Sequence, residues 1–170
     1  MFDVISQELV ELGQNRRFLG ERTSCRFCGT QDQSAFGSRT NAHTFPEALG
    51  NRALFSMDEC RSCNDKFSVY EDALCKAVGP FLTLGGVRGK RGVRKTGRTK
   101  SNSVIAHSVE DGRRHISVKS QGNVDEVGGV DPHDGLVRIR MPVEGDKFVP
   151  LHAYKALSKI AVALLPADEL

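Results

Sequence analysis

Four cysteines in two tight pairs constrain this chain more than any other feature of its sequence. Cys25 and Cys28 form one Cys-x-x-Cys turn, and Cys60 and Cys63 form a second. Each turn can present two thiolates on one side of a knuckle, and two such turns complete the tetrahedral sulfur shell that Zn²⁺ prefers. The sequence therefore predicts a structural zinc site that joins two separate points of the chain.

The two pairs are separated by 31 residues, which is more than the roughly 15 to 20 residues of a compact zinc ribbon. We therefore expect an insertion between the knuckles, and this is where chemistry is expected. A thioredoxin-like redox role is the alternative, but it needs one such pair beside a βαβ pattern, which is not evident here. The fifth cysteine, Cys75, lies in a helical pattern and is expected to act as a small apolar residue.

Length and composition limit the class of protein. The chain has 170 residues, of which 39% are hydrophobic, so it can bury one ordinary core or two small lobes. Its longest apolar run, residues 160–165, is too short to span a membrane, and acidic residues occupy the N-terminus where a signal peptide would be basic. We therefore expect a cytoplasmic protein, in which paired cysteines more often bind metal than form disulfides.

Three regions are expected along the chain. Residues 1–20 contain an N-terminal helix, because Phe2, Ile5, Leu9 and Leu12 recur at helical spacing. Residues 21–80 form the zinc-bracketed module, with short strands at about 38–44 and 53–57 and a helix at about 61–77, closed by a Gly-Pro stop. The helix residues expected to face mostly inward are Phe67, Val69, Tyr70, Leu74 and Val78.

Residues 81–170 form the third region, which follows the Gly-Pro stop. Alternating apolar and polar runs predict strands at 103–108, 115–119 and 136–141 in one small antiparallel sheet, with a long loop at 121–135. A final helix runs from Pro150 to Pro166 and is expected to pack on the zinc-bracketed module. Its apolar stripe consists of Leu151, Tyr154, Leu157, Ser158, Ala161, Leu164 and Leu165.

The insertion between the knuckles contains residues suited to phosphodiester cleavage. A metal-dependent nuclease needs a general base to deprotonate the attacking water and a divalent cation beside the scissile phosphate. His43, near the end of the first strand, is the candidate base because the pKa of histidine lies close to working pH. Asn51 is the candidate that fixes the loop carrying His43, and Asn64 on the following helix is the candidate that holds metal or phosphate.

The order of these motifs resembles a known family. Cys-x-x-Cys, then His-x-x-Pro-Glu-x-Leu-Gly-Asn, then Glu-Cys-x-x-Cys-Asn-x-x-Phe is similar to the HNH endonucleases, specifically the zinc-bracketed branch called HNH endonuclease 5. The resemblance covers residues 25–78 and continues weakly at Gly89-Lys90 and over 154–160. It implies an α+β fold with a zinc-bracketed ββα-metal core, flanking helices and a small antiparallel sheet, together with Mg²⁺ or Mn²⁺ dependence and cleavage of DNA.

One position departs from the family pattern. Many HNH enzymes carry an acidic metal ligand immediately before the catalytic histidine, and this chain has Ala42 there. Asn64, Glu71 and Asp72 are then the candidate ligands of the catalytic metal, and of the two acids only Glu71 shares the helix face of Asn64. If none of these residues holds the metal, the expected site is catalytically weakened.

Each candidate also has an ordinary explanation. A lone histidine such as His43 is usually a surface or core residue, Asn51 after a glycine is a common turn signal, and Asn64 could begin or cap a helix. Charged residues such as Glu71 are usually solvated. The remaining histidines have no partners at metal-ligand spacing and are interpreted as ordinary residues: His107, His115, His133 and His152.

A basic run follows the zinc-bracketed module. Residues 85–100 hold seven basic residues, five glycines and no acid. Such a run is often only a solvated loop, but beside a nuclease site it can neutralise DNA phosphates, and its lack of aromatic residues favours double-stranded over single-stranded DNA. The predicted DNA-binding residues are Arg88, Lys90, Arg91, Arg94, Lys95, Arg98 and Lys100.

The sequence thus predicts a metal-dependent DNA endonuclease with a structural zinc. The alternative is a non-catalytic zinc-stabilised DNA-binding module, which Ala42 keeps open. Family members occur in restriction, in anti-phage defence and beside mobile elements, so the resemblance does not select one role. Homodimerisation and a further C-terminal sensor or effector domain are also left open.

Overall fold

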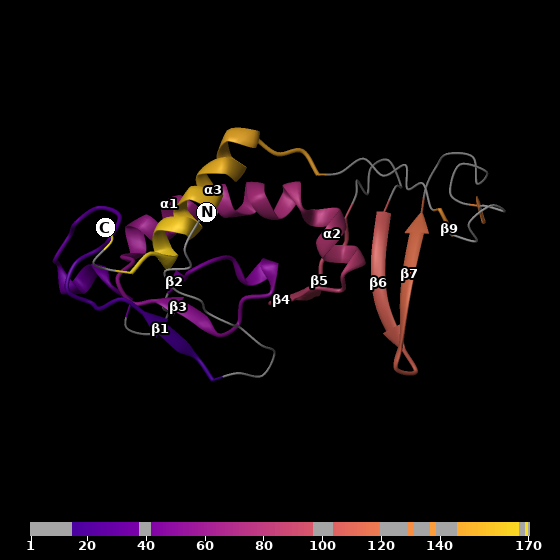
Figure 1. The fold of residues 1–170 in the computed structure, drawn as a ribbon, viewed down its shortest axis with the longest axis horizontal. Helices are drawn as coiled ribbons and strands as arrows, with labels where there is room; N and C mark the ends of the chain where they lie inside the picture. Colours follow the sequence, from indigo (N-terminus) through magenta and orange to yellow (C-terminus); the bar gives the residue numbers. More distant parts are fainter. Residues whose placement is uncertain are drawn as a thin grey trace, which may run out of the picture.

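The protein is described from a computed structural model that covers residues 15–37, 42–96, 104–119, 129–130, 137–138, 146–166 and 169. Within these residues it is a mixed α+β fold with small sheets and three α-helices (Figure 1). The helix expected within residues 1–20 falls largely outside this part of the chain. Residues 17–19 of that region form a strand instead.

Two strands of the zinc-bracketed region and one strand that precedes it form a three-stranded sheet of order β1-β3-β2. Strand β3 (Leu54–Ser56) is buried along its whole length; β1 (Arg17–Leu19) runs parallel to it and β2 (Ala42–His43) antiparallel. Two short 3-10 turns, η1 (Gln33–Ala35) and η2 (Glu47–Leu49), lie in the connections. The predicted strands at 38–44 and 53–57 are thus present in shorter form.

The first and last helices lie above this sheet in the view of Figure 1. Helix α1 (Arg61–Ala77) confirms the helix predicted at about 61–77. The Gly-Pro stop ends it, but the chain enters a second short helix at once, α2 (Gly79–Leu84), because proline is well tolerated in a first helical turn. Helix α3 (Pro150–Leu164) lies across α1 in Figure 1 and is packed against it.

The inward face of α1 is mostly as predicted. Leu74 is buried, and Phe67, Tyr70 and Val78 are partly buried against the core. Val69 was assigned wrongly, since it is 58% exposed. Cys75 is buried as a small apolar residue, as expected, and burial raises the pKa of its thiol to about 11.

The buried face of α3 is not the predicted stripe. Leu151, Tyr154 and Leu157 are 58%, 67% and 54% exposed. The buried positions are instead three alanines and one lysine: Ala153, Ala156, Lys159 and Ala163. Small side chains at spacings of three and four let the backbone of α3 approach α1 closely, so size rather than hydrophobicity determines which face turns inward.

The second half of the chain differs in strand pairing from the single sheet expected. Strands β6 (Val104–Glu110) and β7 (Arg113–Lys119) form one hairpin, and β8 (Gly129–Val130) pairs with β9 (Val137–Arg138) in a separate two-stranded sheet. The loop expected at 121–135 therefore contains a strand. Within the basic run, β4 (Arg88–Gly89) and β5 (Gly92–Val93) form a further hairpin, so part of this run is ordered.

Candidate functional site

The four predicted cysteine ligands lie together, with all their Sγ atoms within 4.8 Å of one another. The Sγ atoms of Cys28 and Cys60 are 3.7 Å apart, which matches the edge of about 3.8 Å of a sulfur tetrahedron built on Zn–S bonds of about 2.3 Å. All five cysteines of the chain are free thiols. The cluster is therefore compatible with a structural zinc that joins the first knuckle to the beginning of α1.

The thiols are held in surroundings that favour a bound cation. Burial raises the pKa of Cys60 and Cys63, so thiolates there need a compensating charge. Burial also raises the pKa of Cys25, but N–H groups directed at its sulfur outweigh this and lower the value to about 7. One of these donors is the backbone N–H of Cys60, 3.4 Å from the Cys25 Sγ.

An arginine links the two knuckles and α3 independently of any metal. Arg26, in the first knuckle, binds Asp58 through Nε and Nη2, at 2.8 Å and 2.6 Å from Oδ2. Its Nη1 donates to the carbonyls of Val162 and Leu165 at the end of α3, at 2.6 Å and 3.0 Å. A Cβ at Gly20 would overlap the Asp58 carboxylate, so the glycine allows this close approach.

His43 lies on β2 directly opposite Phe55, with their ring centroids 4.6 Å apart. Burial lowers the pKa of His43; Glu47 raises it, and the positive charges of Lys159, Arg16 and Lys90 lower it, with a net decrease. The imidazole is therefore neutral at pH 7. A neutral, half-buried imidazole among cations can accept a proton from water next to a bound anion.

Asn51 closes the loop between β2 and β3. Its fully buried side chain donates from Nδ2 to the carbonyls of Phe45 and Leu54, at 2.9 Å and 2.8 Å, and its Oδ1 accepts from the Leu54 N–H at 2.9 Å. This is the geometry that a loop-fixing residue needs. Its effect on the position of His43 stays a prediction.

We expect Asn51→Ala to destabilise the fold by about 2–4 kcal/mol, because it leaves several buried backbone groups without partners. Asn64→Ala is the matched control: the Asn64 side chain is partly exposed and makes no hydrogen bond within the described part of the chain. Urea unfolding followed by circular dichroism measures both changes. Equal losses in the two variants would show that Asn51 does not hold the loop.

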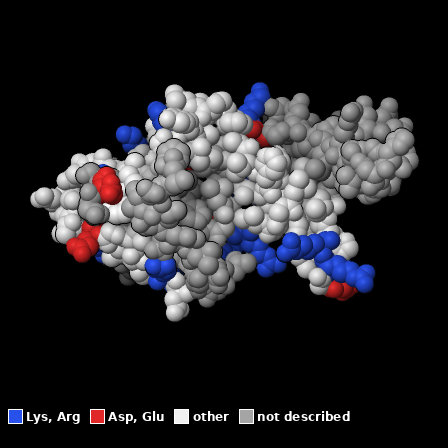
Figure 2. Space-filling view, in the orientation of Figure 1, with Lys and Arg blue, Asp and Glu red and all other residues white. Residues whose placement is uncertain are grey.

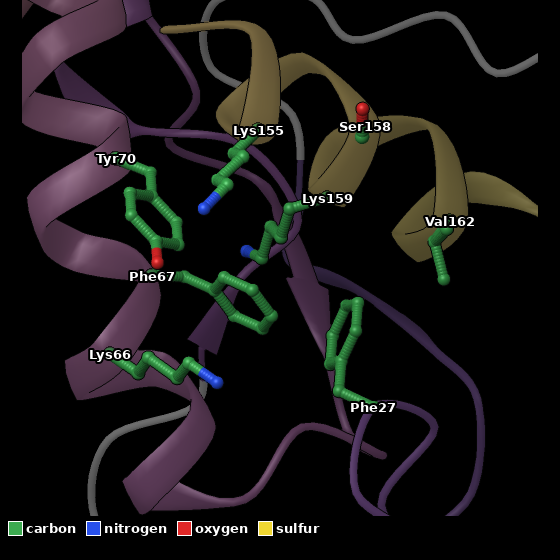
Figure 3. A pocket seen from close by; sticks show the side chains of 8 residues that line it. All are labelled: Phe27, Lys66, Phe67, Tyr70, Lys155, Ser158, Lys159 and Val162. Carbon is green, nitrogen blue, oxygen red and sulfur yellow. The ribbon is translucent and has the colours of Figure 1, made fainter. Parts of the chain in front are cut away.

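Lys159, which no sequence pattern singled out, is buried, with 3% of its surface exposed. Its Nζ lies 3.1 Å from Glu59 Oε2 and 3.0 Å from Glu71 Oε1, and it donates to the carbonyl of His43 at 3.0 Å. Figure 3 shows Lys159 reaching from α3 toward α1, beside Phe67, in a cavity of about 360 Å³ between the helices. One buried lysine thus ties α3 to α1, to the second knuckle and to the strand of His43.

This arrangement argues against a metal-ligand role for Glu71. Its Oε1 is already paired with the Lys159 ammonium at 3.0 Å, and that positive charge would repel a cation bound to the same carboxylate. Asp72, the other acid considered, pairs with Lys76 on the surface of α1. Asn64 lies in the first turn of α1, but the helix is capped by Cys60, so capping does not account for Asn64.

Replacing Lys159 by Met, which has a similar volume, should cost about 3–5 kcal/mol, because Glu59 and Glu71 lose a buried counter-charge. Lys155→Met, one turn earlier on an exposed position, is the control. Burial raises the pKa of Glu59, whereas the charge of Lys159 lowers it. Without the lysine, Glu59 therefore takes up a proton more readily, and protonation removes the buried unpaired charge. The loss measured by urea unfolding should therefore shrink on acidification to about pH 5. A pH-independent loss equal to that of Lys155→Met would contradict the buried ion pair.

The β4–β5 hairpin fastens part of the basic run to the loop after His43. Gly89 lies so close to η2 that an added Cβ would be 3.2 Å from Ala48 Cα, and Arg52 Nη2 donates to the Gly89 carbonyl at 2.9 Å. This places Lys90, in the hairpin turn, where its charge acts on His43. The hairpin therefore presents positive charge beside the candidate base.

The other predicted DNA-binding residues differ in their surroundings. Arg88, Lys90, Arg91 and Lys95 are exposed. Arg94 is paired with Asp146 at 2.6 Å, so its charge is partly neutralised and it is a weaker candidate than predicted. Arg98 and Lys100 lie outside the described residues.

Comparison of the chain with family models, with curated proteins and with solved structures found no match. Among the described residues, no helix has the length and apolar content that crossing a membrane requires.

Proposed function

We propose that this protein is a metal-dependent endonuclease that hydrolyses phosphodiester bonds in double-stranded DNA. The observation that carries the proposal is His43: a half-buried imidazole of lowered pKa on the strand that leads into the loop closed by Asn51, with Arg16 and Lys90 acting on it. Strands β2 and β3 and helix α1 follow one another in the order of a ββα-metal core, with the cysteine cluster at the start of the helix.

In the proposed mechanism, His43 takes the proton from a water molecule that attacks phosphorus. A bound Mg²⁺ or Mn²⁺ would stabilise the pentavalent transition state and the leaving 3′ oxygen. Mg²⁺ keeps several waters and needs few protein oxygens. With alanine at position 42 and Glu71 paired, the candidate donors are the free amide of Asn64 and the carboxylate of Glu47, whose charge acts on His43.

Supercoiled plasmid tests this proposal. Zinc-loaded protein should nick or linearise it when Mg²⁺ or Mn²⁺ is added and leave it supercoiled when neither is present. Ala42 and the engagement of Glu71 favour one alternative, a zinc-stabilised module that binds DNA without cutting it. Plasmid that is bound but stays intact with both metals would support that alternative and reject the nuclease.

A further inference from the structure

A second basic site lies beside the loop that follows His43. A cavity of about 490 Å³ opens between this loop, the end of α2 and the β6–β7 hairpin. Its walls include three arginines and one histidine: Arg52, Arg88, Arg114 and His107. No carboxylate is among the residues that line it, so the cavity collects positive charge without an internal counter-ion.

The three arginines come from separate elements and keep donors available. Arg52 belongs to the loop after His43, Arg88 to β4 and Arg114 to β7, and all three are exposed. Within the described residues none of them forms an ion pair, and their one side-chain hydrogen bond runs from Arg52 to the Gly89 carbonyl. Guanidinium groups converging from three elements match the several oxygens of a phosphate.

His107 adds an imidazole to the cavity wall beside these arginines. Among the described residues, its buried Nε2 has no hydrogen-bond partner, which is uncommon for a buried polar atom. An added Cβ at Gly86, whose φ is +66°, would lie 2.8 Å from this nitrogen. The glycine therefore leaves room for the imidazole against the cavity wall.

The register of the hairpin explains why Arg114 faces the cavity. His107 and Val109 alternate with outward residues on β6, and Val109 lies opposite Arg114 on β7, so these side chains share one face. Arg113, the next residue, points to the other face and does not line the cavity. Figure 2 shows the Lys and Arg side chains of this side as a band that extends toward the tip of the hairpin.

We propose that this cavity binds a backbone phosphate of the DNA close to the one that is cleaved, so that the β6–β7 hairpin serves as a second DNA-contacting arm. This inference rests on the proposed function, since it takes the substrate to be DNA. Because Arg52 belongs to the Asn51-closed loop that directly follows His43, a phosphate held here would fix the register of the duplex relative to His43.

The test compares two neighbouring arginines on the same strand. Binding of a fluorescein-labelled duplex without Mg²⁺, measured by anisotropy over a range of NaCl concentrations, should be about tenfold weaker for Arg114→Ala, and the slope of log K against log[salt] should fall by about 0.9. Arg52→Ala should weaken binding and reduce the salt slope by similar amounts. Arg113→Ala, which removes the same charge from the opposite face, should change both quantities much less.

Equal effects of Arg113→Ala and Arg114→Ala would mean diffuse surface charge and overturn the proposal. Titration with inorganic phosphate distinguishes the other source of this chemistry: saturation of the wild type at low phosphate, with duplex affinity unchanged in Arg114→Ala, would assign the cavity to free phosphate and also overturn it. Failure of the nuclease proposal looks different, because then no variant cuts plasmid while the Arg114 effect on binding persists.

Discussion

Removal of zinc should unfold residues 25–70, and this is the largest effect expected for the protein. The four cysteines connect the first knuckle to the N-terminus of α1, and the binding free energy of such a structural zinc is largely folding free energy, about 10–16 kcal/mol in small fingers. Elemental analysis should find one zinc per chain. Hydrogen exchange after chelation should show loss of protection that begins at the knuckles and extends into α1.

The fifth cysteine provides the matched control for this prediction. Cys63→Ala should abolish zinc binding, whereas Cys75→Ala, which also removes a buried thiol but lies outside the cluster, should retain one zinc. Wild-type protein that is folded, contains no zinc and has four titratable thiols at the cluster would contradict the zinc assignment.

Replacing His43 by Ala should lower the rate of DNA cleavage by about 10²–10⁴-fold, the usual contribution of a general base. Zinc content and DNA affinity should stay close to wild type, because His43 is neither a cysteine-cluster ligand nor part of the basic hairpin. His115→Ala, on an exposed position of β7, is the control and should cleave normally. Single-turnover rates on a short labelled duplex would measure both.

The pH dependence of the rate follows from the surroundings of His43. Because burial and nearby cations lower its pKa, the rate should decline at low pH with a midpoint below about 6.5, the ordinary value for histidine. Lys90→Ala should move this decline to higher pH by removing one of the cations. Because the pKa of His43 is lower in the folded protein than in the unfolded chain, the unfolded chain binds more protons near this pH. The free energy of unfolding should therefore decrease as pH falls through about 6.5.

The sequence predicted the features that depend on local patterns. Two Cys-x-x-Cys turns indicated the cluster, and a long helical period ended by Gly-Pro gave α1 its observed bounds, Arg61–Ala77. Asn51 was selected from a motif, and its buried hydrogen bonds show what such a residue can do locally. These signals are contained in a few consecutive residues, so tertiary contacts do not change them.

The features that were missed depend on tertiary contacts. Strand β1 has three residues, too few for an alternating pattern, and it exists because β3 pairs with it. The apolar side of α3 faces outward because alanines pack more closely on α1, and Lys159 is buried because two carboxylates from other elements meet it. A lysine three residues from an alanine gives no sign of such partners in the sequence.

The central claim is that His43 acts as the base in metal-dependent cleavage. The most direct test is the conversion of supercoiled plasmid by wild type and His43→Ala, purified side by side with equal zinc content, each with and without added Mg²⁺. We expect the wild type to cleave the plasmid only when Mg²⁺ is added, and we expect the cleavage rate of the variant to be lower by at least about a hundredfold. Equal Mg²⁺-dependent cleavage by both proteins would show that the chemistry lies elsewhere.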